Sequence, residues 1–185
     1  AIAPSEDAPK NEDFLKQPLI EKGPAFGKLD SATTVDEWPT YRQNNDRRGS
    51  INANLPETLK VLWKMPFAKL GDGPFIDAWD ARIGSPQPLT APIIAAGTLF
   101  IAGVNSGQVM AASPTTGVLN WKITLGSRID SPPTYYKGLL FVGCHDGWVY
   151  ALKAKDGSLF YRIRLAPKEK KLVAYGSVES LWPVA

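Results

Sequence analysis

The side chains best suited to nucleophilic chemistry are adjacent in this sequence. Cys144 is the single cysteine, and it is followed by His145, the single histidine, and by Asp146. A cysteine nucleophile needs a base within hydrogen-bonding distance of its sulfur. Adjacent residues in a tight turn do not easily form that hydrogen bond, so we expect no catalysis from this triplet. A single cysteine also excludes an intrachain disulfide and a zinc cluster.

The acidic residues indicate turns rather than a metal site. Asp146 and Asp156 both precede glycine, which is typical of hairpin turns. Glu179 is the one carboxylate that we expect near an inner strand, where a structural or channel-lining role is favoured over a metal ligand. The chain lacks the spacings of an EF-hand, a P-loop and a Gly-x-Ser-x-Gly nucleophile. We therefore assign no catalytic residue and no metal ligand.

Composition excludes several classes of function. The chain has 185 residues, of which 44% are hydrophobic and 21% charged, as expected for a soluble domain with its own core. The net charge of +3 comes from interspersed charges and not from the basic stripe that nucleic-acid binding requires. No apolar run approaches the ~18 residues of a membrane span. We expect Arg42, Arg47 and Arg48 to be solvated or locally paired.

The first part of the chain differs from the rest in its hydrophobic pattern. Residues 1–36 have no clean hydrophobic period, so we expect an extended arm that lies on the domain or is partly disordered. The polar start at Ala1 suits a mature exported protein after signal removal, and equally a proteolytic product. Residues 37–185 carry the repeats and are predicted to form the folded domain.

An internal repeat defines the fold. Residues 90–123 and 131–164 share prolines, glycines and aromatic residues at an offset of about 40 residues, a period typical of propeller blades. Within the second unit, turn residues separate four short strands at about 133–136, 139–144, 148–152 and 159–164. The sequence therefore predicts an all-β fold, a partial β-propeller of four-stranded antiparallel blades.

Partial blades flank the two units. Residues 59–65 resemble the outer strand at 117–123, and residues 178–185 are predicted to be the inner strand of a further blade. Eight positions are expected to hold the repeat together, because bulky aromatics pack between blades and glycines allow the turns. These structural positions are Trp38, Trp63, Gly107, Gly117, Trp121, Gly147, Gly157 and Tyr161.

An insertion separates the leading outer strand from the first full unit. Residues 66–88 make this connection about 17 residues longer than the next equivalent one. Such connections project from one mouth of a propeller channel, and long loops at a functional face often bind ligands. The alternative is a lid that only packs on the blade tops. The candidate ligand-binding residues are Phe75, Asp77, Trp79, Asp80 and Arg82.

Four segments resemble a known family. Residues 151–161 (ALKAKDGSLFY) and 111–121 (AASPTTGVLNW) are similar to the repeat Ala-x-Asp-x-x-Thr-Gly-x-x-x-Trp of dehydrogenases that use pyrroloquinoline quinone (PQQ). Residues 37–49 resemble the start of such quinoprotein propellers, and residues 130–157 resemble secreted bacterial PQQ-like propellers. The lipoprotein scaffold of outer-membrane protein assembly shares this repeat. The signature aspartate is replaced by Ser113 and Lys153, which leaves the turn glycines intact.

The resemblance leaves three functions open. The first is a non-catalytic binding or scaffolding propeller of an exported bacterial protein, periplasmic or secreted. The second is the N-terminal part of a PQQ-dependent dehydrogenase whose calcium ligands and base lie beyond Ala185. The third is a structural subunit whose arm wraps a neighbour. We expect neither PQQ nor calcium in these residues, because such enzymes often have a vicinal disulfide that one cysteine cannot form. The expected partners are other blades, from the same parent chain or a second polypeptide, and further proteins.

Overall fold

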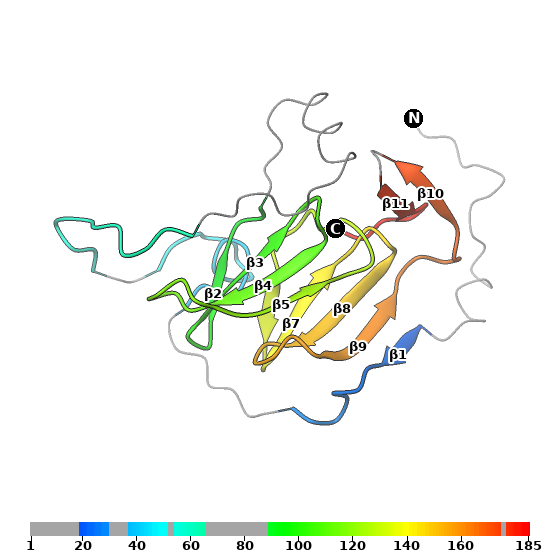
Figure 1. Ribbon diagram of the computed structural model, residues 1–185, viewed down its shortest axis with the longest axis horizontal. Helices are drawn as coiled ribbons and strands as arrows, with labels where there is room; N and C mark the ends of the chain where they lie inside the picture. Colours follow the sequence, from blue (N-terminus) through cyan, green and yellow to red (C-terminus); the bar gives the residue numbers. More distant parts are fainter. Residues whose placement is uncertain (1–18, 30–36, 52–53, 66–88, 175–176) are drawn as a thin grey trace.

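The computed structural model describes residues 19–29, 37–51, 54–65, 89–174 and 177–185. Every regular element in these ranges is a β-strand, and the strands pair in antiparallel sheets (Figure 1). The all-β fold with propeller blades is therefore confirmed. None of the described residues belongs to a helix with the length and apolar character of a membrane span.

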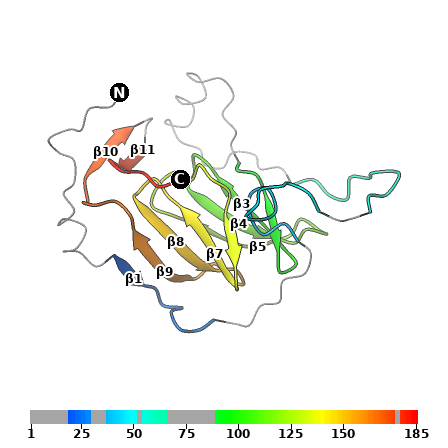
Figure 2. The same ribbon diagram turned by 180° about the vertical axis from the view of Figure 1, so that it is seen from behind.

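Two sheets of the same design follow each other along the chain and lie against one another in both views (Figures 1 and 2). The first blade consists, from its inner to its outer edge, of β2 (Ile93–Ala95), β3 (Thr98–Gly103), β4 (Gln108–Ala112) and β5 (Leu119–Thr124). The second consists of β6 (Thr134–Tyr136), β7 (Leu139–Gly143), β8 (Trp148–Lys153) and β9 (Leu159–Arg164).

The strand registers confirm the repeat at the level of single residues. Phe100 is opposite Ala111 in the first blade, and Phe141 is opposite Ala151 in the second. Both alanines are fully buried, and each is also opposite the aromatic residue of its outer strand, Trp121 or Tyr161. Each blade then has a register shift immediately after that alanine. The two units therefore share their turns, their pairing and their irregularities.

The core lies between the two blades. Phe100 and Ile93 from the first blade and Leu140 and Val142 from the second are almost completely buried in one cluster. Tyr135 stacks on Phe100 with ring centroids 6.5 Å apart. Fully burying one side chain of this size contributes about 1.5–3 kcal/mol, so this cluster fixes how the blades pack.

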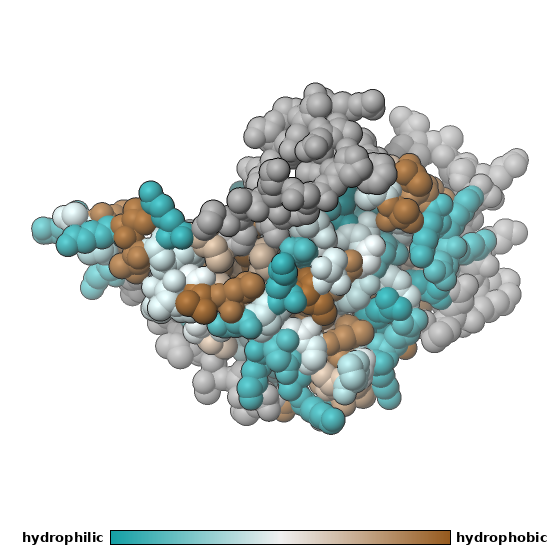
Figure 3. Space-filling model, viewed as in Figure 1, coloured by the Kyte–Doolittle hydropathy of each residue, from teal (hydrophilic) through white to brown (hydrophobic). Residues whose placement is uncertain are grey.

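The segment predicted as the leading outer strand is not assigned as a strand. No described strand pairs with residues 59–65, and a strand requires such a partner. Trp63 nevertheless docks on the first blade, where its Nε1 donates to Pro114 O at 2.8 Å. Residues 54–65 project away from the sheets (Figures 1 and 3), and Leu55, Leu59 and Leu62 among them are at least 77% exposed.

The end of the chain departs from the prediction. The strand there is β11 (Ser177–Ser180), which pairs with β10 (Lys171–Ala174), and residues 181–185 are irregular. The backbone explains the difference: Ser180 N donates to His145 O at 2.7 Å, as Ile129 N donates to Val104 O at 3.1 Å one repeat earlier. Residues 180–185 thus correspond to the lead-in before an inner strand, so the predicted strand at 178–185 was placed too early.

The described part of the N-terminal arm lies on the domain. Strand β1 (Ile20–Lys22), which the sequence did not indicate, pairs with β9 as a fifth strand at the outer edge of the second blade. Arg162 of β9 donates to Glu21 from both Nε and Nη2. Further on, Trp38 forms two backbone hydrogen bonds with Ile94 at the inner edge of the first blade, both 2.9 Å long.

Candidate functional site

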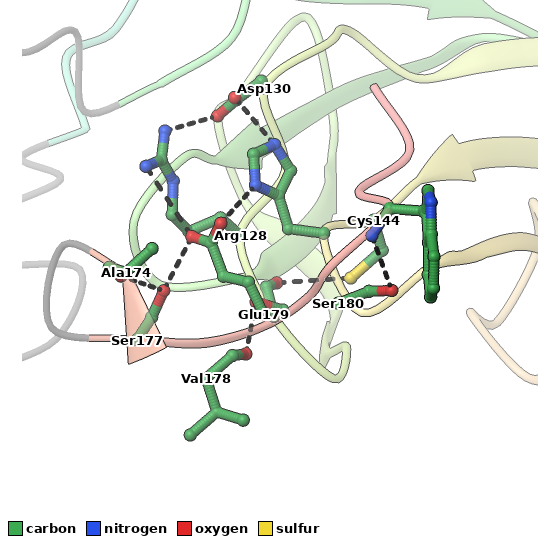
Figure 4. Close-up of polar contacts among 11 residues, drawn as sticks. Arg128, Asp130, Cys144, Ala174, Ser177, Val178, Glu179 and Ser180 are labelled. Carbon is green, nitrogen blue, oxygen red and sulfur yellow. Dashed lines mark hydrogen bonds and ion pairs between the residues drawn. The ribbon is translucent and has the colours of Figure 1, made fainter. Parts of the chain in front are cut away.

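A cluster of charged side chains lies where three connections meet at one end of the second blade (Figure 4). Arg128 and Asp130 come from the connection between β5 and β6. His145 comes from the turn between β7 and β8, and Glu179 comes from β11. In a propeller these connections lie at the same mouth of the channel, which is the face where the sequence predicted ligand binding.

The four side chains form a closed ring of contacts. His145 Nε2 is 2.8 Å from Asp130 Oδ2, and its Nδ1 is 3.0 Å from Glu179 Oε2. Arg128 Nη2 is 2.8 Å from Asp130 Oδ1, and Nη1 is 3.8 Å from Glu179 Oε1. Ser177 Oγ also donates to Glu179 Oε1 at 2.9 Å. The imidazole and the guanidinium therefore both bridge the same two carboxylates.

Burial makes this ring more than a surface ion pair. The side chains of Arg128, His145 and Glu179 are at most 12% exposed, whereas that of Asp130 is 35% exposed. Buried charges are costly unless they are paired and hydrogen-bonded. Here Arg128 and Glu179 each take part in an ion pair and in a hydrogen bond. Asp130 is consequently the member that other molecules can reach.

Hydrogen bonds to backbone carbonyls hold the same three connections together. His145 N donates to Arg128 O at 2.9 Å, and Ser127 Oγ donates to Val178 O at 3.0 Å. Gly147 allows this approach, because a Cβ there would lie 2.6 Å from the Cβ of Ala166 and 3.0 Å from Ser180 Oγ. The ring thus joins the β10–β11 hairpin to the second blade.

Cys144 is beside the ring but is poorly suited to nucleophilic chemistry. Its side chain is fully buried, and Sγ donates to Ser127 O at 3.4 Å. Burial, followed by the negative charge of Asp146, raises the pKa of the thiol to about 12. Since the thiolate is the reactive form, the thiol is inert at neutral pH. Both ring nitrogens of His145 contact carboxylates, so His145 does not act as a base toward the Cys144 thiol.

The ring does not fit a calcium ion of the quinoprotein kind. Calcium takes six to eight oxygen ligands, mainly carboxylate and carbonyl oxygens. Here Glu179 Oε1 accepts from Ser177 and faces Arg128, and Oε2 contacts His145. Both oxygens therefore have partners, and the guanidinium of Arg128 lies against Oε1. The single cysteine likewise cannot supply a vicinal disulfide.

The predicted residues fall into two groups. The candidate binding residues Phe75, Asp77, Trp79, Asp80 and Arg82 lie outside the described residues, so that prediction stays a prediction. The repeat positions lie in turns and blade contacts: Trp38 at an inner edge, Trp63 and Trp121 on the next blade, Tyr161 on β9, and Gly107, Gly117, Gly147 and Gly157 in turns with positive φ.

The sequence analysis did not identify Arg128 and Asp130, and it considered His145 and Glu179 individually and not as parts of one site. The signal that finds them is positional: in a repeat protein, charged residues in successive blade connections meet at one face. Arg128 and Asp130 stand in the connection after the outer strand of the first blade, and Glu179 stands in the connection after the second.

The repeated blades, the indoles docked on turn glycines and the polar mouth define the class of the protein, a β-propeller with PQQ-like repeats. A family model described as outer membrane protein assembly factor BamB matches residues 47–182, and the chain belongs to this PQQ-like repeat family.

Individual relatives agree with that assignment. Outer membrane protein assembly factor BamB of Alteromonas naphthalenivorans is 32% identical over 56% of the chain and 26% of its own length. The protein of the same name from Burkholderia pseudomallei is 35% identical over 52% and 25%. The chain thus spans about a quarter of these relatives. Among solved structures, quinohemoprotein alcohol dehydrogenase from Comamonas testosteroni aligns with 17% identity and a TM-score of 0.46 over 72% of the chain and 20% of that structure.

Proposed function

We propose that this chain is part of a non-catalytic propeller that binds and holds other proteins in an extracytoplasmic compartment. The relatives named outer membrane protein assembly factor support a scaffolding role in the bacterial envelope. The same names support a periplasmic or otherwise exported location. The remaining blades come from the same parent chain or from a second polypeptide.

The observation that carries this proposal is the ring of Arg128, Asp130, His145 and Glu179 at the mouth. In an active site, a base or nucleophile must be available to the substrate. In this ring both nitrogens of the imidazole contact carboxylates, and the neighbouring thiol is buried and protonated. Such an arrangement favours a rigid binding face over a reactive centre.

A second feature supports assembly with further strands. Trp63 is docked as in a complete blade, yet residues 59–65 have no partner strand among the described residues. In the first blade, the equivalent outer strand pairs with β4, where Ala111 is opposite Trp121. The strand that completes the leading blade therefore presents a small residue opposite Trp63.

We further propose that these residues bind neither PQQ nor calcium. The support is the donor set: Glu179 has both carboxylate oxygens committed, and one cysteine provides no disulfide over a quinone. Titration of the 185-residue chain with PQQ and calcium, followed by absorbance and calorimetry, tests this. Saturable binding of one equivalent at micromolar affinity is the contrary result.

The scaffolding and dehydrogenase hypotheses predict different behaviour of the native parent protein. We expect the tagged protein, cross-linked in isolated envelopes and solubilised in detergent, to migrate in a complex larger than itself that contains outer-membrane assembly proteins. Replacing the exposed carboxylate, Asp130→Lys, should weaken this association, whereas the exposed Asp46→Lys should not. Migration of the wild type as a free monomer, together with PQQ-dependent alcohol oxidation in a dye-linked assay, would instead establish the enzyme.

A further inference from the structure

A second polar surface lies away from the charged ring, at the inner edges of the two blades. The loop of residues 37–46 and strand β6 line an open groove with a volume of about 650 Å³. Backbone hydrogen bonds fix the loop on both sides: Trp38 pairs with Ile94, and Tyr135 N donates to Pro39 O at 2.8 Å. The groove is therefore built before any ligand arrives.

The two carboxylates of the groove already have partners. The Glu37 carboxylate accepts the backbone N–H groups of Ala96 and Gly97. The Asp46 carboxylate is 3.6 Å from Arg48 Nε. Within the described part of the chain, the lining residues include neither lysine nor arginine, although Lys137 Nζ lies 5.2 Å from the ring centroid of Tyr136. A free anion would therefore meet the two carboxylates, and a cation at Asp46 would compete with Arg48.

The remaining polar groups suit hydroxyl groups. Gln43, Asn44 and Asn45 contribute side-chain amides, and Thr40 contributes a hydroxyl. An amide both donates and accepts hydrogen bonds, which matches the dual character of an alcohol. Tyr136, whose side chain is 59% exposed, supplies an aromatic ring at the same groove.

One buried polar atom at the groove, Asn44 Oδ1, lacks a hydrogen-bond partner within the described residues. The hydroxyl of Tyr135 is buried as well, but it takes a hydrogen bond from the backbone of Gly138 and so already has a partner. Buried polar groups in folded proteins nearly always have a partner, so each such atom calls for a specific reason. A bound hydroxylated molecule would supply a donor to the amide oxygen.

The backbone of the loop is also unusual. Arg42, Gln43 and Arg47 have φ values of 58°, 76° and 53°, in the left-handed region that residues other than glycine rarely adopt. Hydrogen bonds from Gln43 N to Thr40 O and from Gly49 N to Arg42 O, 3.0 and 3.1 Å long, hold this conformation. Strain of this kind is concentrated at ligand sites, where it sets the direction of side chains.

We propose that this groove binds a neutral polyhydroxylated molecule, of which a saccharide unit is the chemical type. The amides of residues 43–45 contact its hydroxyls, and Tyr136 packs against its apolar face. This inference does not depend on the scaffolding role, because the groove shares no residue with the ring at the mouth.

The test uses the ¹⁵N-labelled 185-residue chain and the neutral trisaccharides of glucose and N-acetylglucosamine. We expect saturable shifts of the side-chain amide signals of Asn44 and Asn45 and saturation transfer to the sugar. Asn44→Ala should weaken binding at least ~10-fold, since it removes a buried hydrogen-bonding group. Asn120→Ala, on the exposed face of β5, is the matched control and should leave binding unchanged.

A second variant guards against misfolding. Asn45→Ala removes an exposed amide of the groove lining, so it should retain the wild-type melting temperature and lose affinity. Inorganic phosphate and spermidine serve as charged probes and should not shift the Asn44 and Asn45 signals. The proposal is overturned if neither trisaccharide binds, if Asn44→Ala and Asn45→Ala bind as well as the wild type, or if a charged probe binds in the groove.

Discussion

The indole of Trp121 packs directly on Gly157 of the following blade, where a Cβ would lie 2.7 Å from the ring atom Cε3. The indole N–H of Trp121 donates to Ala154 O at 3.0 Å. Trp63 has the same relation to Gly117, and its N–H donates to Pro114 O. Strand β5 and the segment that carries Trp63 are thus each fastened to the next blade by one flat contact and one hydrogen bond.

Gly157→Ala should therefore destabilise the protein by about 2–4 kcal/mol, because the new methyl group collides with the indole and the backbone has a φ of +73°. Urea unfolding measures the loss. Gly97→Ala is the control, since its φ of +67° gives similar backbone strain with no atom within 4 Å of the added Cβ. Equal losses for the two variants would show that the indole contact contributes nothing.

The charged ring predicts a large effect from a small chemical change. Glu179→Gln keeps the shape of the side chain but leaves Arg128 and His145 with one carboxylate in place of two, so we expect a loss of about 3 kcal/mol. Amide exchange should accelerate in the β10–β11 hairpin. Glu169→Gln removes a carboxylate that pairs with Lys171 at 3.5 Å in solvent, and it should cost less than about 0.5 kcal/mol. Similar losses for both would make the ring an ordinary surface contact.

Cys144 predicts a loss of stability at alkaline pH. Burial raises the pKa of its thiol to about 12, above the ordinary value of 9.0, so above pH 9 the unfolded chain releases a proton that the folded chain keeps. The free energy of unfolding should therefore fall as the pH rises from 9 toward 12. Burial also raises the pKa of Tyr150, which acts in the same direction.

Cys144→Ala separates the two contributions. The variant should show a shallower fall in the urea midpoint between pH 9 and 11, with the remaining slope due to Tyr150 and other groups. Iodoacetamide should modify the native wild-type thiol far more slowly than the thiol of the unfolded chain. Identical pH profiles for variant and wild type, with rapid native alkylation, would contradict the assigned burial.

The projecting segment predicts self-association of the isolated 185-residue chain. Leu55, Leu59 and Leu62 are at least 77% exposed and lie in a segment without a partner strand among the described residues, and such apolar surface favours association. Val61→Lys should shift the chain toward monomer in light scattering. Val173→Lys is the control. Val173 is 76% exposed, close to the 72% of Val61, but Val173 lies on the paired strand β10. A monomeric wild-type chain would count against this prediction.

The blades were predictable because each repeat contains the turn residues that separate its strands. Glycines after short polar stretches fix the hairpins, and the alternation of Phe141, Ala151 and Tyr161 across neighbouring strands follows from pairing alone. The ring was not predictable, because Arg128 and Glu179 come together only when two connections of different length fold over one end of a blade. Strand β1 was also missed, because three exposed residues bear no hydrophobic period and owe their conformation to the free edge of β9.

The pairing of β1 with β9 also sets an order of events during synthesis. Glu21 and Arg162 are 141 residues apart in the chain, yet they form one ion pair. At a translation rate of ~5–20 residues per second, the N-terminal segment waits roughly 7–30 s before its partner strand leaves the ribosome. The first blade can close in that interval from local contacts alone. Residues 20–22 can therefore join the second blade only after β9 is present, later than the first blade can form.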